Sequence, residues 1–92
     1  MLNNEFMLMQ ADRFARRVLK EAGNDPAAQV KTMYEIALSR EPTSKEIDNN
    51  VAFLKKQQAA GASGASEDAA ALSALTDLAH VTLNLNEFVY IR

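Results

Sequence analysis

The sequence predicts an all-α fold, a small bundle of about four helices with a short C-terminal turn, and three observations support it. The 92 residues include only three Gly and two Pro, and all five lie where a helix is expected to start or stop. Between these positions, apolar residues recur at the i, i+3, i+4, i+7 spacing of a buried helix face. Hydrophobic residues form 48% of the chain, which excludes a disordered polypeptide. We therefore expect residues 1–92 to form one helical domain.

The first helix is expected over residues 4–21. Its apolar face is formed by residues at helical spacing, namely Met7, Ala11, Phe14, Ala15 and Val18. Gly23 suits the left-handed conformation that commonly follows the end of a helix. The second helix opens at the Asp-Pro pair 25–26, because Asp is a preferred N-cap and Pro is tolerated at the first helical position. It is expected to include Arg40 and to stop before Pro42.

The third helix opens with a capping box. In this motif the Thr43 hydroxyl accepts a hydrogen bond from the N–H of Glu46, and the Glu46 carboxylate accepts one from the N–H of Thr43. The short connections on either side of the second helix favour antiparallel neighbours, so we expect the first three helices to run up and down. The placement of the fourth helix is left open, because a longer loop rich in Gly and Ser precedes it.

The fourth helix is expected to begin at residues 66–68 and to be the most buried, because apolar residues cover much of its circumference. A separate short turn is expected at the end of the chain, capped by Asn86 and pinned to the core by Phe88. We also expect Glu87 in this turn to form an ion pair with Arg40 at the end of the second helix.

Composition excludes several classes of protein. Ten basic and twelve acidic residues give a net charge of −2, which argues against a dedicated nucleic-acid-binding protein. The absence of cysteine excludes disulfides, thiol chemistry and cysteine-ligated zinc. No apolar run approaches the ~18 residues of a membrane span. The first five residues lack the features of a signal peptide, so an export signal would have to lie on a longer parent chain.

The sequence predicts no enzyme, no cofactor and no metal site. A zinc site needs three or four ligands, and His80 is the only histidine; we interpret it as an ordinary helix residue. No glycine-flanked nucleophile accompanies the serines, and Gly61 and Gly64 lack the Lys-Ser or Lys-Thr of a phosphate-binding loop. The carboxylates fall in first helical turns or on polar faces, where the helix dipole explains them.

Two groups of residues in the first helix are candidates for binding a partner, together with Tyr90 near the end of the chain. The first is a basic stripe at i, i+3, i+4, i+7 spacing that consists of Arg13, Arg16, Arg17 and Lys20. Such a stripe can bind an acidic protein or a phosphate backbone. A solvated face is the simpler interpretation, because Asp12 and Glu21 partly neutralise it. The second group is Phe6 and Met9, since methionine-rich surfaces adapt to many partners.

Three segments of the chain resemble a known family. Residues 34–46 are similar to its "LALGRxPTxxE" stretch, residues 83–91 to its "LLNxNEFxYxD" tail, and residues 1–6 to its "LLNxxFV" entry. In order and spacing they resemble the C-terminal region of the planctomycete surface domain proteins, which are large bacterial proteins of unknown function associated with planctomycete-type cytochrome c domains. The residues that carry the resemblance form a candidate structural motif: Arg40, Pro42, Thr43, Glu46, Asn84, Asn86, Glu87 and Phe88.

This resemblance implies that the chain is the C-terminal domain of a larger exported or cell-surface protein, and it supplies no catalytic residue. The chain departs from the pattern at Ser39, where Gly is usual, and at Arg92, where an acid is common. A second resemblance, to the helical modules of phycobilisome linkers, is weakened because those modules carry Asp and Gly after the Pro. Both imply a non-catalytic interaction or structural module, whose partner is another domain of the parent chain or another protein. A nucleic-acid-binding domain is the alternative, and the oligomeric state is left open.

Overall fold

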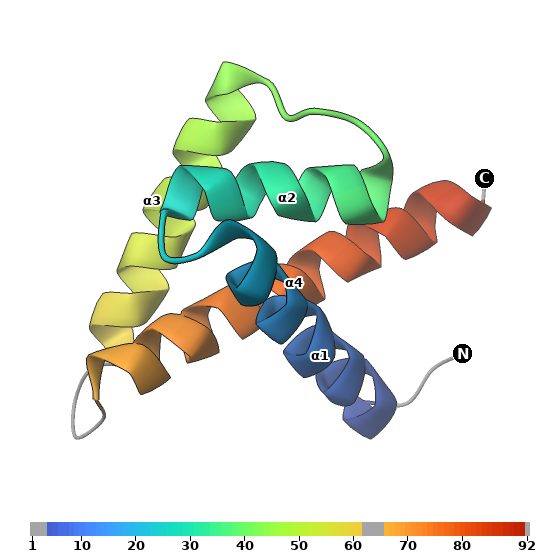
Figure 1. Ribbon diagram of the computed structural model, residues 1–92. Coiled ribbons are helices and arrows are strands. Elements are labelled where there is room, and N and C mark those ends of the chain that lie inside the picture. The colour runs from blue at the N-terminus through green and yellow to red at the C-terminus, as the bar shows by residue number, and fades with distance from the viewer. Residues whose placement is uncertain (1–3, 62–65, 92) are drawn as a thin grey trace.

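The computed structural model describes residues 4–61 and 66–91, with side chains described for residues 5–61 and 66–85. Four helices and no strand occupy this part of the chain, which confirms the all-α prediction (Figure 1). In chain order the helices are α1 (Asn4–Ala22), α2 (Pro26–Leu38), α3 (Ser44–Ala60) and α4 (Glu67–Ile91).

The buried face of α1 is the predicted one: Met7, Ala11, Phe14, Ala15 and Val18 are each at most 8% exposed. The helix is followed, as expected, by Gly23, which has a φ of +72° and donates its N–H to the carbonyl of Leu19 at 2.9 Å. Glycine is favoured there because an L side chain is strained at positive φ. This residue turns the chain from α1 into α2.

Helix α2 begins at Pro26 as predicted but ends at Leu38, two residues before Arg40. Asp25 occupies the N-cap position, although its side chain makes no capping hydrogen bond. The helix stops early because Ser39 adopts the left-handed conformation, with φ +54° and ψ +35°. Arg40 therefore lies in the connection to α3 and not in the last helical turn.

Replacing Ser39 with glycine should stabilise the domain. The left-handed conformation costs an L residue roughly 1–2 kcal/mol, a cost that glycine avoids. Glycine also gives the unfolded chain more conformational freedom, and this offsets part of the gain in stability. We expect Ser39→Gly to raise the free energy of unfolding by about 0.5–1 kcal/mol, measured by urea denaturation. Ser39→Ala is the matched control and should give no such gain, because alanine is also strained at φ +54°. Equal stability of the two variants would contradict this explanation.

Helices α3 and α4 both start with a side-chain cap. The predicted capping box of Thr43 and Glu46 is confirmed in both directions. Ser66 accepts a hydrogen bond through Oγ from the N–H of Ala69 at 3.1 Å. The prediction of a separate C-terminal turn was wrong. Helix α4 continues without a break to Ile91, so Asn86 lies inside this helix and does not begin a new one.

Helix α4 organises the packing because it contacts α1, α2 and α3 (Figure 1). The expectation that the first three helices run up and down was wrong for α2 and α3, whose axes cross in Figure 1. The core lies where the helices meet, and its largest fully buried side chains are Met33, Val18, Val30 and Thr82. The Thr82 hydroxyl is satisfied within α4, since it donates to the carbonyl of Leu78 at 2.9 Å.

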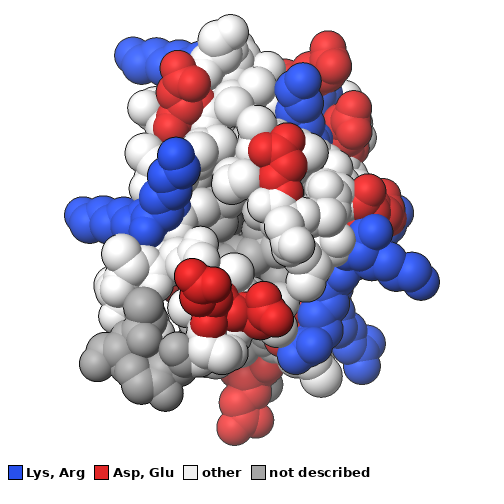
Figure 2. All heavy atoms as spheres, turned by 60° about the vertical axis from the view of Figure 1, so that its left-hand side comes forward, with Lys and Arg blue, Asp and Glu red and all other residues white. Residues whose placement is uncertain are grey.

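Charged side chains of both signs are spread over the face formed by α3 and the start of α4 (Figure 2). This mixture fits the small net charge of −2. A polar contact joins the two helices on their exposed sides, where Gln57 Nε2 donates to Asp77 Oδ2 at 3.0 Å.

Candidate functional site

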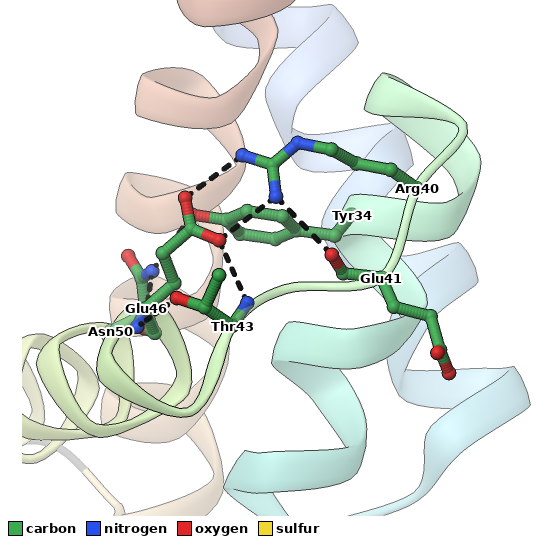
Figure 3. A network of polar contacts seen from close by, with 6 residues as sticks. All are labelled: Tyr34, Arg40, Glu41, Thr43, Glu46 and Asn50. Atoms are coloured by element: carbon green, nitrogen blue, oxygen red, sulfur yellow. Dashed lines mark hydrogen bonds and ion pairs between the residues drawn. The ribbon is translucent and has the colours of Figure 1, made fainter.

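The connection between α2 and α3 is held by an ion pair that the sequence analysis did not anticipate (Figure 3). Arg40 donates through Nη1 to Glu46 Oε1 at 2.9 Å and through Nη2 to Glu46 Oε2 at 2.8 Å. Glu46 Oε1 also accepts the N–H of Thr43 at 2.8 Å, while Thr43 Oγ1 accepts the N–H of Glu46 at 3.1 Å. One carboxylate therefore caps α3 and binds the guanidinium in a bidentate manner, the geometry that arginine favours.

Tyr34 and Asn50 extend this contact into the domain. The Arg40 guanidinium lies 5.1 Å from the centroid of the Tyr34 ring, within the range of a cation–π interaction. Asn50 donates through Nδ2 to the Tyr34 hydroxyl at 3.0 Å and to the carbonyl of Glu46 at 2.7 Å. We call these five residues, Tyr34, Arg40, Thr43, Glu46 and Asn50, the α2–α3 corner.

The α2–α3 corner is built to fix a turn. Its one guanidinium and one carboxylate are bound to each other, and Pro42 lies in the connection between them. The expected partner of Arg40 was Glu87, but the structure gives this role to Glu46, six residues along the chain. The Glu87 side chain lies outside the described residues, as do those of Asn86, Phe88 and Tyr90, while Asn84 is exposed on α4.

Acid should weaken the α2–α3 corner. The hydrogen bond from Arg40, together with that from the Thr43 N–H, lowers the pKa of Glu46 from its ordinary 4.5 to about 2. Because the folded-state pKa lies below the unfolded-state value, the stabilisation is complete above pH 4.5 and is lost as the pH falls from about 4.5 to about 2. We expect Glu46→Gln to be less stable than wild type at pH 6, with the difference shrinking towards pH 2, in urea titrations at each pH.

Glutamine is the suitable replacement because it can still act in a capping box while losing the charge. Glu35→Gln is the matched control, since Glu35 is exposed on α2 and has no ion pair among the described residues. That variant should follow the wild-type pH dependence. A Glu46→Gln protein whose stability deficit stays constant from pH 6 to pH 2 would contradict the assignment.

The predicted partner-binding residues of α1 share the side of the helix opposite its buried face. We call this surface the outer face of α1; it consists of Phe6, Met9, Arg13, Arg16, Arg17 and Lys20, all of them exposed. Phe6 is 38% exposed and Met9 46% exposed, so an apolar patch occupies the N-terminal end of this face. The cations follow towards its C-terminal end.

Two of the four cations on the outer face of α1 are neutralised within the helix. Arg16 donates through Nε to Asp12 Oδ2 at 3.0 Å, and Arg17 donates through Nε to Glu21 Oε2 at 2.8 Å. The suggestion that Asp12 and Glu21 offset the stripe is therefore confirmed. Arg13 and Lys20 have no ion pair among the described residues, so they keep their charge available to a partner. Exposed i, i+4 pairs of this kind are weak and exchange readily.

Other exposed apolar side chains lie on α1 and on the second half of α4. Leu8 is 55% exposed, Val81 is 45% exposed and Leu85 is 46% exposed. Single exposed apolar residues are ordinary on protein surfaces, but Leu8 belongs to the same helix as Phe6 and Met9. Leu8, Val81 and Leu85 were not among the sequence-predicted candidates.

The described residues contain no group of three or more His, Asp or Glu side chains able to hold a metal ion. His80 is half-buried in α4. In the part of the chain that the structure describes, no helix is both long enough and apolar enough to span a membrane. The sequence matches no family model, and neither a curated protein nor a solved structure matches it significantly.

Proposed function

We propose that the chain is a non-catalytic helical module that docks onto another domain of a larger exported bacterial protein through the outer face of α1. One observation carries the proposal: Phe6 and Met9 are exposed on the same side of the helix as Arg13 and Lys20, two cations that form no ion pair with a described residue. An apolar patch beside charges is a common composition for a protein interface, where apolar anchors supply affinity and charges supply orientation.

The resemblance to the C-terminal region of the planctomycete surface domain proteins supports a larger, exported parent. Residues 34–46, which carry most of the resemblance, contain four of the five residues of the α2–α3 corner, where Glu46 binds both Arg40 and Thr43. Mutual contacts among the residues of a motif give it a structural reason to exist that requires no ligand. The motif then serves to fix the domain, and the outer face of α1 serves to bind.

A protein partner is favoured over nucleic acid. Of the four cations on the outer face of α1, two are bound to acids of the same helix, and the whole chain carries a net charge of −2. Binding to a phosphate backbone depends on many cations and falls steeply with salt. The apolar residues Phe6 and Met9 would contribute little to phosphate contacts.

The test is a binding titration between this chain and the segment that precedes it in its gene, expressed as a separate protein. Phe6→Ser with Met9→Ser should weaken binding at least about tenfold through loss of apolar contact. Arg13→Glu with Lys20→Glu should also weaken it, mainly by slowing association, with a clear dependence on salt.

Lys56→Glu is the matched control, because Lys56 is exposed on α3, away from the outer face of α1. It should bind as wild type does. A gene that encodes no further domain, or a titration in which the outer-face variants and the control behave alike, would refute the proposal. Salt-dependent binding of DNA that is lost in Arg13→Glu with Lys20→Glu would replace it with the nucleic-acid alternative.

A further inference from the structure

A groove of about 670 Å³ is lined by residues of all four helices and shares no residue with the α2–α3 corner. We call it the junction groove. The end of α1, the start of α2, the second half of α3 and the first turns of α4 line it. Its volume falls within the range of small-molecule binding sites in proteins. Figure 2 shows this face of the domain, with a hollow in its middle and acidic side chains along the lower edge.

The floor of the junction groove is apolar. Leu54, Ala74 and Leu75 belong to the buried core, while Leu19 and Leu72 are only partly buried and line the groove. Partly buried leucines at the bottom of a concave surface favour a ligand with an apolar body, because such a ligand removes their remaining surface from water.

Gln29 supplies a polar group on the wall that α2 contributes. The residue is 8% exposed, and its Nε2 donates to the carbonyl of Gly23 at 2.7 Å. Its Oε1 has no hydrogen-bond partner among the described residues. Every fully buried side-chain oxygen of the described residues does have a partner. This oxygen is therefore not fully buried, and Gln29 is one of the residues that line the junction groove. The lining thus includes a largely buried side-chain amide whose oxygen accepts no hydrogen bond from the described residues.

Two carboxylates stand on the wall that α4 contributes. Glu67 and Asp68 are exposed in the first turn of α4, and both line the groove. Lys55 is the one cation in the lining, so the titratable groups there sum to a net charge of −1. Acceptors and negative charge around an apolar floor complement a positively charged hydrogen-bond donor with an apolar body.

We propose that the junction groove binds a small organic cation, a primary amine that carries an apolar or aromatic group. The ammonium group is bound by Glu67, Asp68 and the Oε1 of Gln29, while the apolar body lies on Leu19 and Leu72. The proposal does not depend on docking through the outer face of α1, since the groove and that face share no residue.

The test is a titration of the ¹⁵N-labelled chain with 2-phenylethylamine at pH 7, followed by the amide signals of the protein. The amides of Gly23, Gln29 and Leu72 should shift and saturate, with a dissociation constant in the millimolar range typical of a fragment this small. The neutral analogue 2-phenylethanol should bind at least about fivefold more weakly, and the anion 3-phenylpropionate should bind more weakly still.

Charge substitutions test the same site from the protein side. Glu67→Gln with Asp68→Asn should weaken the amine about fivefold, whereas Lys55→Gln should strengthen it about twofold. Lys45→Gln is the matched control, because Lys45 lies in the first turn of α3 and does not line the groove. The proposal is overturned if no groove amide shifts up to about 20 mM amine, a range that covers fragment affinities. It is equally overturned if the anion binds as well as the amine.

Discussion

Leu78→Ala should lower the free energy of unfolding by about 3 kcal/mol, the largest effect that we expect from a single substitution. Leu78 is 2% exposed and belongs to the core cluster on α4, the helix that contacts the other three. Truncation removes apolar contacts and leaves a cavity that its neighbours fill only in part. A domain of this length has roughly 5–14 kcal/mol of stability, so the loss is a large share of the total. Urea denaturation monitored by circular dichroism measures it.

Leu85→Ala is the matched control for Leu78→Ala. It is the same substitution two helical turns further along α4, at a position that is 46% exposed. We expect a loss below about 0.5 kcal/mol, as for an ordinary surface position. Both residues lie on the same side of α4, so the pair tests how far along the helix the core extends. If both substitutions cost the same, Leu85 would be packed as Leu78 is, and the end of α4 would not be exposed as described here.

Gly23→Ala should lower the free energy of unfolding by about 1.5 kcal/mol, the second-largest expected effect. A Cβ at Gly23 would meet no heavy atom within 4 Å, so the cost comes from the backbone alone. With φ at +72°, the residue must hold a left-handed conformation that alanine disfavours. Thermal or urea denaturation of the variant measures the cost.

Gly61→Ala is the matched control for Gly23→Ala. Gly61 also follows a helix, but its φ is −90° in the right-handed region, and a Cβ there would make an ordinary 3.4 Å contact. Alanine should therefore be neutral or slightly stabilising, because it reduces the freedom of the unfolded chain. A loss at Gly61 as large as that at Gly23 would show that the handedness of the backbone is not the cause.

Local chemistry made most helix boundaries predictable from the sequence. Gly23, Pro26 and Thr43 each act within one turn of their own position, so a reader of the sequence needs no knowledge of the rest of the fold. The buried face of α1 was predictable for the same reason, since its apolar residues repeat at the period of a single helix.

The two predictions of helix boundaries that were wrong concern positions where local signals compete. Asn86 was expected to cap a separate turn, yet no Gly or Pro occurs between residues 67 and 91 to stop α4. Asparagine inside a helix costs only about 0.7 kcal/mol relative to alanine, so the helix continues through it. The predicted end of α2 was too late, because Ser39 adopts the left-handed conformation although it is not glycine. The Gly that is usual at this position in the resembled family was the available signal.

The candidate sites were predictable only in part, because tertiary contacts complete them. The outer face of α1 follows from helical spacing alone, and its residues are exposed as that spacing requires. The α2–α3 corner was half-predicted, since the capping box gave Thr43 and Glu46 but not Arg40 as their partner. Tyr34 and Asn50 were missed, because their side chains meet only through the way in which α2 and α3 pack together. The sequence of either helix alone does not show that packing. The junction groove is lined by residues of all four helices, so the sequence pattern of a single helix does not predict it.

The most direct test of the proposed docking uses the absence of cysteine from the chain. A single thiol introduced as Met9→Cys, where the native side chain is 46% exposed, can be compared with one introduced as Lys56→Cys on α3. In the isolated chain both thiols should react freely with a maleimide. In the full product of its gene, the thiol at position 9 should react at least about tenfold more slowly, while the thiol at position 56 is unchanged, because a docked domain excludes reagent from the outer face of α1. Equal reaction rates at position 9 in the two proteins would contradict the account.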